Sequence, residues 1–380
     1  MIGQRLQFSI LCFVTVIVVG VTACGGRSSS VLQEPNAAHR GEMSTLISSA
    51  SRVPQRAIGM ITEFTIPTSQ AYPFGIAAGP DGNIWFTEAS TMQSNKIAKI
   101  TMSGDITEYP VPASSAIPEE ITAGPDGNLW FTESNAENIG KISTIGVITE
   151  YHVSTVNASL EGIAAGSDGN LWFTEYFGNK IGKITTTGKI TEYAIPTDHA
   201  IPFAITSGPD GNLWFAEYLA NKIGKITTKG VITEYPVPTV EGNPVGITAG
   251  PDGNLWFTES FYNKIGKITT RGVFTEYLIP TNASQPSGIT VGPDHNLWFV
   301  EQNTDKIGRI TLTGNITEYA IPTSNAHPFF IAAGPDLNLW FTENFSSQIG
   351  AITSGCLRYS AAMNCSSNLQ GSGPQYLNNR

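Results

Sequence analysis

One ten-residue run recurs along this chain of 380 residues and limits the folds it can form. In its clearest copy, at 250–259, the run reads Gly-Pro-Asp-Gly-Asn-Leu-Trp-Phe-Thr-Glu, and it occurs seven times with small variations. Each copy holds one tryptophan: Trp85, Trp130, Trp172, Trp214, Trp256, Trp298 and Trp340. The first two tryptophans are 45 residues apart, and each later pair is 42 residues apart. A fixed period of this length indicates a repeat architecture.

Each repeat contains four strand-like pieces, as the copy at 202–237 illustrates. The first is a short apolar stretch at 202–207, and a Pro-Asp-Gly-Asn turn leads into the second at 213–217. The third lies at 222–227, and a Lys-Gly turn leads into the fourth at 231–237, which alternates in period two. Short strands divided by turn residues, without helical periodicity, predict an all-β fold. Four strands in each repeat of this length predict a propeller blade.

The closure of the ring follows from counting strands along the chain. Seven copies of the first three strands run from Phe74 to Thr353, and only six fourth strands follow them, the last at 316–321. Residues 61–67 match the fourth-strand pattern and precede the first copy. We therefore expect this N-terminal strand to complete the last blade, which removes an open sheet edge. The prediction is a seven-bladed propeller over 59–353, with four antiparallel strands in each blade.

Residues 1–23 have the pattern of a targeting segment. Arg5 is their sole charge, and the apolar run after it is shorter than the roughly 20 residues of a membrane-spanning helix. The run ends in Val-Thr-Ala-Cys, which resembles a bacterial lipobox and implies cleavage before Cys24 and lipidation of Cys24. An ordinary secretory peptide is the alternative. Both interpretations place the mature protein outside the cytoplasm. If Cys24 is lipidated, the lipid anchor is the contact of the protein with the membrane. We expect residues 24–58 to be a flexible tether.

The net charge of the chain limits the classes of molecule it can bind, and its cysteine positions allow one disulfide. The formal net charge of −10 argues against nucleic acid or anionic lipid as a partner. A closed ring leaves no strand edge for pairing, so we expect a monomer. The C-terminal tail at 354–380 holds Cys356 and Cys365, which can form a disulfide in an oxidising compartment. The sequence does not give their geometry, so this pairing stays open.

The repeats resemble those of the streptogramin lyases, also called virginiamycin B lyases. The shared pattern reads GPDGNLWFTE, then NKIGKIT, then ITEY and IPT, and it covers about 59–353. The resemblance implies a seven-bladed propeller that opens the cyclic ester of type B streptogramin antibiotics by elimination. It also implies Mg²⁺ held by glutamates, a histidine base, and a site on the face opposite the Pro-Asp-Gly-Asn turns.

We name that face the loop face. It carries the first-strand loops, which lead into the first strand of each blade, and the hairpin loops between strands two and three. The three extra residues of the first repeat fall in its hairpin loop, and insertions in repeat proteins collect on the binding face. Aromatic residues also gather there, which suits a planar or apolar ligand. The predicted ligand-binding residues are Tyr72, Phe74, Phe203, Phe329 and Phe345. Packing between blades is the alternative role for such rings.

A glutamate ends the second strand of every repeat: Glu88, Glu133, Glu175, Glu217, Glu259, Glu301 and Glu343. In five repeats a lysine begins the third strand directly across the hairpin: Lys96, Lys180, Lys222, Lys264 and Lys306. This arrangement predicts cross-strand ion pairs of roughly 0.2–1 kcal/mol. Glu133 and Glu343 lack such a lysine. We therefore predict that they bind Mg²⁺ or contact another bound molecule.

Blade two carries further acidic residues near the loop face. These are Glu119, Glu120 and Glu137, and Glu161 follows in the next first-strand loop. Hard cations prefer oxygen ligands, so this group can hold Mg²⁺ or Ca²⁺. A solvated acidic rim is the alternative, and it is the interpretation that the sequence favours.

The positions of the histidines test whether the catalytic mechanism implied by the resemblance can operate in this chain. The resemblance places the base in a Glu-Pro-His-Gly-Ile motif of the last blade, and the matching stretch, 327–331, reads His-Pro-Phe-Phe-Ile. Phe329 stands at the base position and cannot abstract a proton. None of the other six blades has a histidine at this position. His327 lies near it, and with Glu343 it forms the best candidate catalytic pair.

Functions from different classes remain open. The first is a lipid-tethered propeller that binds a small molecule, a glycan or an extracytoplasmic protein on the loop face. The second is a Mg²⁺-dependent lyase that linearises a cyclic ester such as a type B streptogramin, which would give antibiotic resistance. The missing histidine favours binding, and the length of the resemblance favours chemistry. A propeller that contacts only proteins stays a third alternative.

Overall fold

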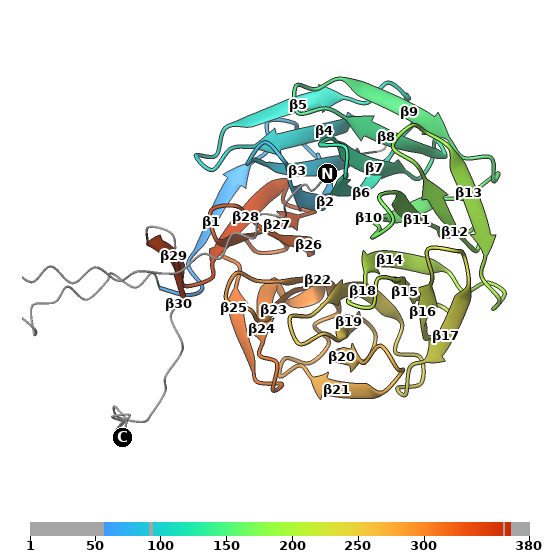
Figure 1. The fold of residues 1–380 in the computed structure, drawn as a ribbon. Coiled ribbons are helices and arrows are strands. Elements are labelled where there is room, and N and C mark those ends of the chain that lie inside the picture. Colours follow the sequence, from blue (N-terminus) through green and yellow to red (C-terminus); the bar gives the residue numbers. More distant parts are fainter. Residues whose placement is uncertain (1–56, 91–93, 360–361, 366–380) are drawn as a thin grey trace, which may run out of the picture. The chain divides into compact units, whose positions relative to one another are not determined.

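A computed structural model describes residues 57–90, 94–359 and 362–365. These residues form seven four-stranded antiparallel sheets arranged as blades around a central channel (Figure 1). The one helical element of this described part is η1 (Gln302–Thr304), a single 3-10 turn. The predicted all-β, seven-bladed propeller is confirmed. The targeting segment, Cys24 and nearly all of the predicted tether lie outside the described residues.

Each blade begins at the channel and ends at the rim. The first strands are β2 (Pro73–Ala78), β6 (Pro118–Ala123), β10 (Leu160–Ala165), β14 (Pro202–Ser207), β18 (Pro244–Ala249), β22 (Pro286–Val291) and β26 (Pro328–Ala333). The second strands are β3 (Ile84–Ser90), β7 (Leu129–Glu133), β11 (Leu171–Glu175), β15 (Leu213–Glu217), β19 (Leu255–Glu259), β23 (Leu297–Glu301) and β27 (Asn338–Glu343).

The outer half of each blade consists of its third and fourth strands. The third strands are β4 (Ser94–Ile100), β8 (Asn138–Ile142), β12 (Lys180–Ile184), β16 (Lys222–Ile226), β20 (Lys264–Ile268), β24 (Lys306–Ile310) and β28 (Gln348–Thr353). The fourth strands are β5 (Ile106–Pro110), β9 (Ile148–His152), β13 (Ile190–Ala194), β17 (Ile232–Pro236), β21 (Phe274–Leu278), β25 (Ile316–Ala320) and, for the last blade, β1 (Ile61–Thr65).

The N-terminal strand closes the ring. β1 pairs antiparallel with β28, from Ile61 opposite Ile352 to Thr65 opposite Gln348. The last blade therefore has the strand order β1-β28-β27-β26, and Figure 1 shows these strands from opposite ends of the chain side by side. The predicted closure is confirmed, and it pairs an edge that would otherwise attract other chains.

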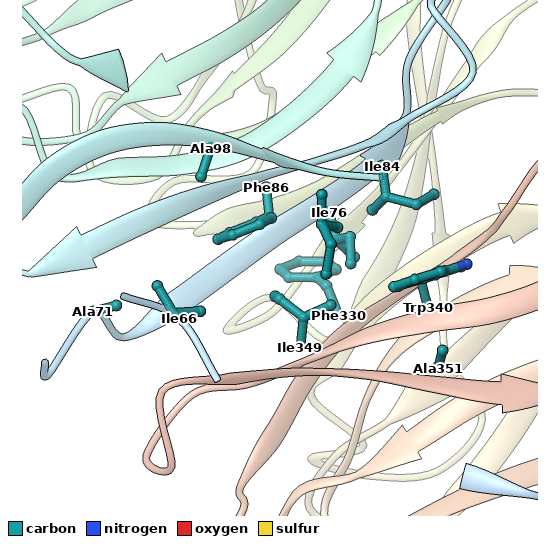
Figure 2. Packing of buried hydrophobic residues seen from close by; sticks show 11 residues of the cluster. Ile66, Ala71, Ile76, Ile84, Phe86, Ala98, Phe330, Trp340, Ile349 and Ala351 are labelled. Atoms are coloured by element: carbon teal, nitrogen blue, oxygen red, sulfur yellow. The ribbon is translucent and has the colours of Figure 1, made fainter. Parts of the chain in front are cut away.

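The hydrophobic core is a ring of seven clusters, one between each pair of neighbouring blades. The second strands supply most of it, because their Leu-Trp-Phe sequence presents large apolar side chains to both faces of each sheet. Figure 2 shows the cluster between the last and first blades, where Trp340 and Phe330 pack against Ile76, Ile84 and Phe86. Each blade is therefore stabilised by its two neighbours.

The turn before each second strand anchors the tryptophan of that strand. In blade four, Asp210 accepts a hydrogen bond of 3.0 Å from Trp214 Nε1 and bonds of 3.3 and 2.8 Å from Asn212. Desolvation opposes ionisation of Asp210, but these hydrogen bonds outweigh it and lower the pKa of its carboxyl. Tyr235 stacks on the indole at 5.6 Å, and Lys225 lies over the ring at 5.1 Å.

Replacing this aspartate tests the anchor. Asp210→Ala is expected to lower the free energy of unfolding by about 2 kcal/mol, because the buried indole N–H of Trp214 loses its acceptor. Urea denaturation measures the change. The matched control is Asp198→Ala, which removes an exposed carboxylate and is expected to shift stability by less than about 0.5 kcal/mol. Equal effects of the two substitutions would contradict the anchor.

A two-stranded hairpin follows the last blade. β29 (Cys356–Tyr359) pairs with β30 (Ala362–Cys365), and a disulfide joins Cys356 to Cys365. The sulfur of Cys365 lies 3.7 Å from the carbonyl oxygen of Pro293, so the hairpin sits beside the turn face of blade six. In the part of the chain described here, no helix is long and apolar enough to cross a bilayer.

Candidate functional site

The first-strand loops share an unusual backbone. The residue before each first strand has a positive φ, between 47° and 56°: Tyr72, Ile117, Ser159, Ile201, Asn243, Gln285 and His327. A non-glycine residue in this conformation carries roughly 1–3 kcal/mol of strain. Because all seven repeats share it, the strain belongs to the repeat and does not mark one blade as a site. It does fix the backbone at two predicted site residues, Tyr72 and His327.

Three of the predicted ligand-binding residues meet at the loop-face mouth of the channel. The rings of Phe74 and Phe329 lie 4.2 Å apart, and the ring of Phe203 lies 6.4 Å from that of Phe329. Blade four, which supplies Phe203, stands across the ring from blade seven, which supplies Phe329. The three rings therefore bridge the mouth of the channel.

The other two predicted ligand-binding residues form a second aromatic group with His327. Phe345 stacks on the imidazole of His327 at 4.2 Å and meets Tyr72 edge-on at 6.5 Å. Burial lowers the pKa of His327, and the Asp305 carboxylate opposes that change. An imidazole in this setting is neutral at neutral pH, which a base requires.

A pocket of about 330 Å³ opens between these aromatic groups. Its lining residues are Tyr72, Phe74, Ala89, Glu119, Phe329 and Asn344. Three predicted ligand-binding residues thus share one pocket with a carboxyl group. Below it, the first strands enclose about 320 Å³ of the channel, and Glu120 is the one charged residue among the described residues that line this space.

Glu119, Glu120 and Glu161 form a carboxyl cluster at the channel mouth. Burial raises the pKa of Glu119 to about 7, although Ser134 donates a hydrogen bond of 3.2 Å to it. Burial raises the pKa of Glu120 to about 8, although Ile163 N donates to its carboxyl at 3.0 Å. The pKa of Glu161 is raised well above its usual range by burial and then by the charges of Glu119 and Glu120.

The predicted solvated acidic rim is therefore only partly right for these three residues. They are half-buried at the channel mouth, and this partial burial is enough to raise the pKa of their carboxyls. Glu137, the fourth predicted member, instead accepts a hydrogen bond from the backbone N–H of Asn157 in a neighbouring loop. The sequence predicted that these acids lie near one another, but it did not show that burial would raise the pKa of three of them.

The predicted ion pairs between the strand-two glutamates and the lysines opposite them are wrong, because those lysines pair with other carboxylates. The register is as expected, with Glu217 opposite Lys222. The ammonium group of Lys222, however, turns outward to Glu234 of the fourth strand, at 3.6 Å. The same pattern recurs in other blades, with the pairs Lys96–Glu108, Lys180–Glu192, Lys264–Glu276 and Lys306–Glu318. The long lysine side chain reaches a more exposed carboxylate, where both charges stay hydrated.

The strand-two glutamates are consequently buried acids. All seven have no exposed surface. Burial raises the pKa of six of them to about 7 or about 8: Glu133, Glu175, Glu217, Glu259, Glu301 and Glu343. In blade four the nearby Glu234 carboxylate raises the pKa of Glu217 further, and a neutral Glu217 can donate a hydrogen bond to it. These side chains therefore belong to the interior of the blades.

The predicted Mg²⁺ ligands and the predicted catalytic pair do not assemble into a metal site. Glu133 bonds to Asn138 at 3.0 Å within blade two, and Glu343 bonds to Ser346 at 3.0 Å within blade seven. Among the described residues, no three His, Cys, Asp or Glu side chains are arranged to hold a metal ion. The residues present therefore do not fit Mg²⁺. His327 and Glu343 share no hydrogen bond among those found in this part of the chain.

Comparison with known proteins bears on both fold and site. The sequence profile of the virginiamycin B lyase family matches residues 48–256 and 241–360, which span most of the chain. The chain belongs to the virginiamycin B lyase family. Its fold and its repeat pattern are therefore those of the family, as the sequence predicted.

Solved structures of virginiamycin B lyases extend this result. A streptogramin B lyase is 41% identical, with a TM-score of 0.74, over 77% of this chain and 97% of that one. The virginiamycin B lyase of Staphylococcus aureus is 42% identical, with the same TM-score, over 77% of this chain and 99% of that one. A catalytically inactive histidine-to-alanine variant of the latter enzyme, with quinupristin, is 41% identical over the same shares.

Proposed function

We propose that this member of the virginiamycin B lyase family binds a small molecule in the pocket at the channel mouth. The single observation that carries the proposal is the pocket of about 330 Å³, which combines the rings of Tyr72, Phe74 and Phe329 with one carboxyl. Apolar walls with few convergent polar groups are typical of small-molecule sites. The volume suits a ligand side chain or a small ring system rather than a protein surface. A glycan or an extracytoplasmic protein is the alternative ligand.

The second candidate function is elimination on a cyclic ester, as in the lyases that the chain resembles. Identity of 41% over nearly the full length of a lyase favours it. In such a step a base removes a proton from the carbon next to the one that bears the alkoxy oxygen of the ester. The electron pair of that C–H bond forms a carbon–carbon double bond, and the alkyl C–O bond breaks to leave a carboxylate. Phe329 cannot be that base. Glu119 lines the pocket with a pKa of about 7, which suits a general base at neutral pH.

Quinupristin tests both candidates, because it accompanies a solved relative. We expect calorimetric titration to show that it binds the purified chain, and Phe329→Ala to weaken binding roughly tenfold by removing one pocket wall. Phe261→Ala is the matched control, because Phe261 is an exposed aromatic of the loop face outside this pocket. Equal loss in both variants, or no binding, would contradict the pocket.

The same samples report on chemistry. Elimination conserves all atoms, so a linear product has the mass of the antibiotic and is recognised by its retention time and fragment ions. We expect the antibiotic to elute unchanged, with Mg²⁺ or with EDTA. A new peak that Glu119→Gln abolishes would instead establish the lyase, and dependence on Mg²⁺ would show that the ligand assembles a metal site.

We also propose an extracytoplasmic location, with Cys24 as a lipid anchor. The apolar leader and the Val-Thr-Ala-Cys sequence support it. The disulfide between Cys356 and Cys365 agrees with it, because such bonds persist in oxidising compartments.

A further inference from the structure

The second residue of each first strand indicates which class of ligand the channel mouth binds. Around the ring these residues are Phe74, Glu119, Glu161, Phe203, Val245, Ser287 and Phe329. The carboxyls and two of the three rings come from two different pairs of neighbouring blades. The carboxyls come from the adjacent blades two and three, and the rings of Phe74 and Phe329 come from the adjacent blades one and seven, in contact at 4.2 Å.

The carboxyl side has no basic partner in the described part of the chain. None of the ion pairs found there involves Glu119, Glu120 or Glu161. Glu119 accepts from one serine hydroxyl and Glu120 from one backbone N–H. Glu161 is half-buried, and no hydrogen bond joins its carboxyl to a described residue.

A metal ion is a poor partner for this cluster. Mg²⁺ and Ca²⁺ require oxygen ligands at roughly 2.0–2.6 Å on several sides. The three carboxyls are near enough for their charges to interact, but they do not converge closely enough to hold a metal ion. An ammonium group does not require such close convergence, because it interacts with carboxylates at hydrogen-bond distance or beyond.

The aromatic side of the mouth favours the same ligand. A cation lying within about 6 Å of an aromatic ring is attracted to the ring face, and desolvation strengthens this attraction. Phe74 and Phe329 line the pocket that also holds Glu119. One ligand can therefore place a positive group against the carboxyls and an apolar body against the rings.

We infer that the channel mouth selects an organic cation: an ammonium compound with an apolar or aromatic body, its charge beside Glu119 and Glu161 and its body on Phe74 and Phe329. This inference rests on the small-molecule function proposed above and names the ligand class of the same site. It assigns the carboxylates of blades two and three to recognition.

Calorimetric titration of the full chain with benzyltrimethylammonium and with benzyl alcohol tests the inference. The two probes share an aromatic body and differ in charge. We expect the cation to bind at least about tenfold more tightly than the alcohol. Glu161→Gln and Glu119→Gln are each expected to reduce this preference, and the double substitution to abolish it while the alcohol affinity stays unchanged.

Glu241→Gln is the matched control, since it removes the same charge from an exposed first-strand loop of blade five on the same face. It is expected to retain the full preference, which excludes a general effect of net charge. Thermal melting checks that each variant folds, and Glu161→Asp, which keeps the charge, is expected to keep part of the preference. Equal affinity of the wild type for both probes, or a preference that survives the double substitution, would overturn the inference. If quinupristin still binds in that case, the proposed small-molecule function stands without it.

Discussion

Removal of residues 1–67 is expected to abolish a stable, soluble propeller. The deletion takes away β1, which pairs with β28 and buries Ile66 and the ring of Phe64 against Trp340 at 5.5 Å. Loss of the buried Ile66 side chain alone costs about 2–5 kcal/mol, a large part of a typical net stability of about 5–15 kcal/mol. We expect the melting temperature to fall by about 10 °C or more, measured by circular dichroism.

The matched control for this deletion is a chain that begins at residue 57, which keeps β1 complete. It is expected to melt with the full-length chain. Light scattering provides a second measurement, because the exposed edge of β28 is expected to make the shorter chain associate. A shorter chain that melts like the control and stays monomeric would show that blade seven is stable with three strands, against our interpretation of the closure.

Stability is expected to fall as the pH rises from about 5 to about 8, because of the strand-two glutamates. In the unfolded chain these carboxyls have the ordinary pKa of 4.5, and burial raises the pKa of six of them to about 7 or about 8 in the fold. A raised carboxyl pKa contributes stability that is fully present below the unfolded pKa and is lost as the pH rises through the folded pKa. If one net pKa unit survives at each of these sites, the total loss is about 8 kcal/mol.

The opposite trend is expected at lower pH. Hydrogen bonds overcome desolvation and lower the pKa of the turn aspartates below 3.8, as for Asp168, Asp210 and Asp252. Their contribution is lost as the pH falls through these lowered values. Melting temperatures across the pH range are therefore expected to peak near pH 4, between the ordinary pKa of 3.8 for aspartate and that of 4.5 for glutamate.

One substitution separates the buried acids from the net charge of the protein. Glu217→Gln replaces a buried acid by a neutral group of the same shape, so it is expected to raise stability by about 1 kcal/mol at pH 8 and to leave it unchanged at about pH 4. Glu241→Gln removes an exposed charge and is expected to change neither value by more than about 0.5 kcal/mol. A flat pH profile, or destabilisation of Glu217→Gln at pH 8, would contradict the raised pKa values.

The fold was predictable because repetition magnifies weak local signals. A single Pro-Asp-Gly-Asn turn such as that at 209–212 indicates only one reversal of the chain, but seven copies at a fixed period define a ring. The closure by residues 61–65 was predictable for the same reason, since a missing piece stands out in a regular series. The carry-over of the family site was predictable only in part. The replacement of histidine by Phe329 was visible, but the sequence did not show whether another residue of the site takes over as the base.

The electrostatics of the site were less predictable because they depend on side-chain reach and on distant blades. The pairing of Glu217 opposite Lys222 was correct in register, yet the lysine bonds to Glu234. Register fixes Cβ positions, whereas the end of a long side chain can select among several carboxylates. Similarly, Glu119 and Glu161 lie one repeat apart in sequence, and the packing of neighbouring blades places their carboxyls near enough for their charges to interact.

The pairing of the first strand with the last sets the order of events when the protein is made. The backbone N–H of Met60 bonds to the hydroxyl of Thr353, 293 residues later in the chain. Since the ribosome releases the N-terminal end first, β1 emerges before every other strand and finds its partner only when the last blade has emerged. Closure is thus the step with the longest loop to order. A chain that ends before β28 cannot complete the ring, so the fold itself distinguishes a full-length product from a truncated one.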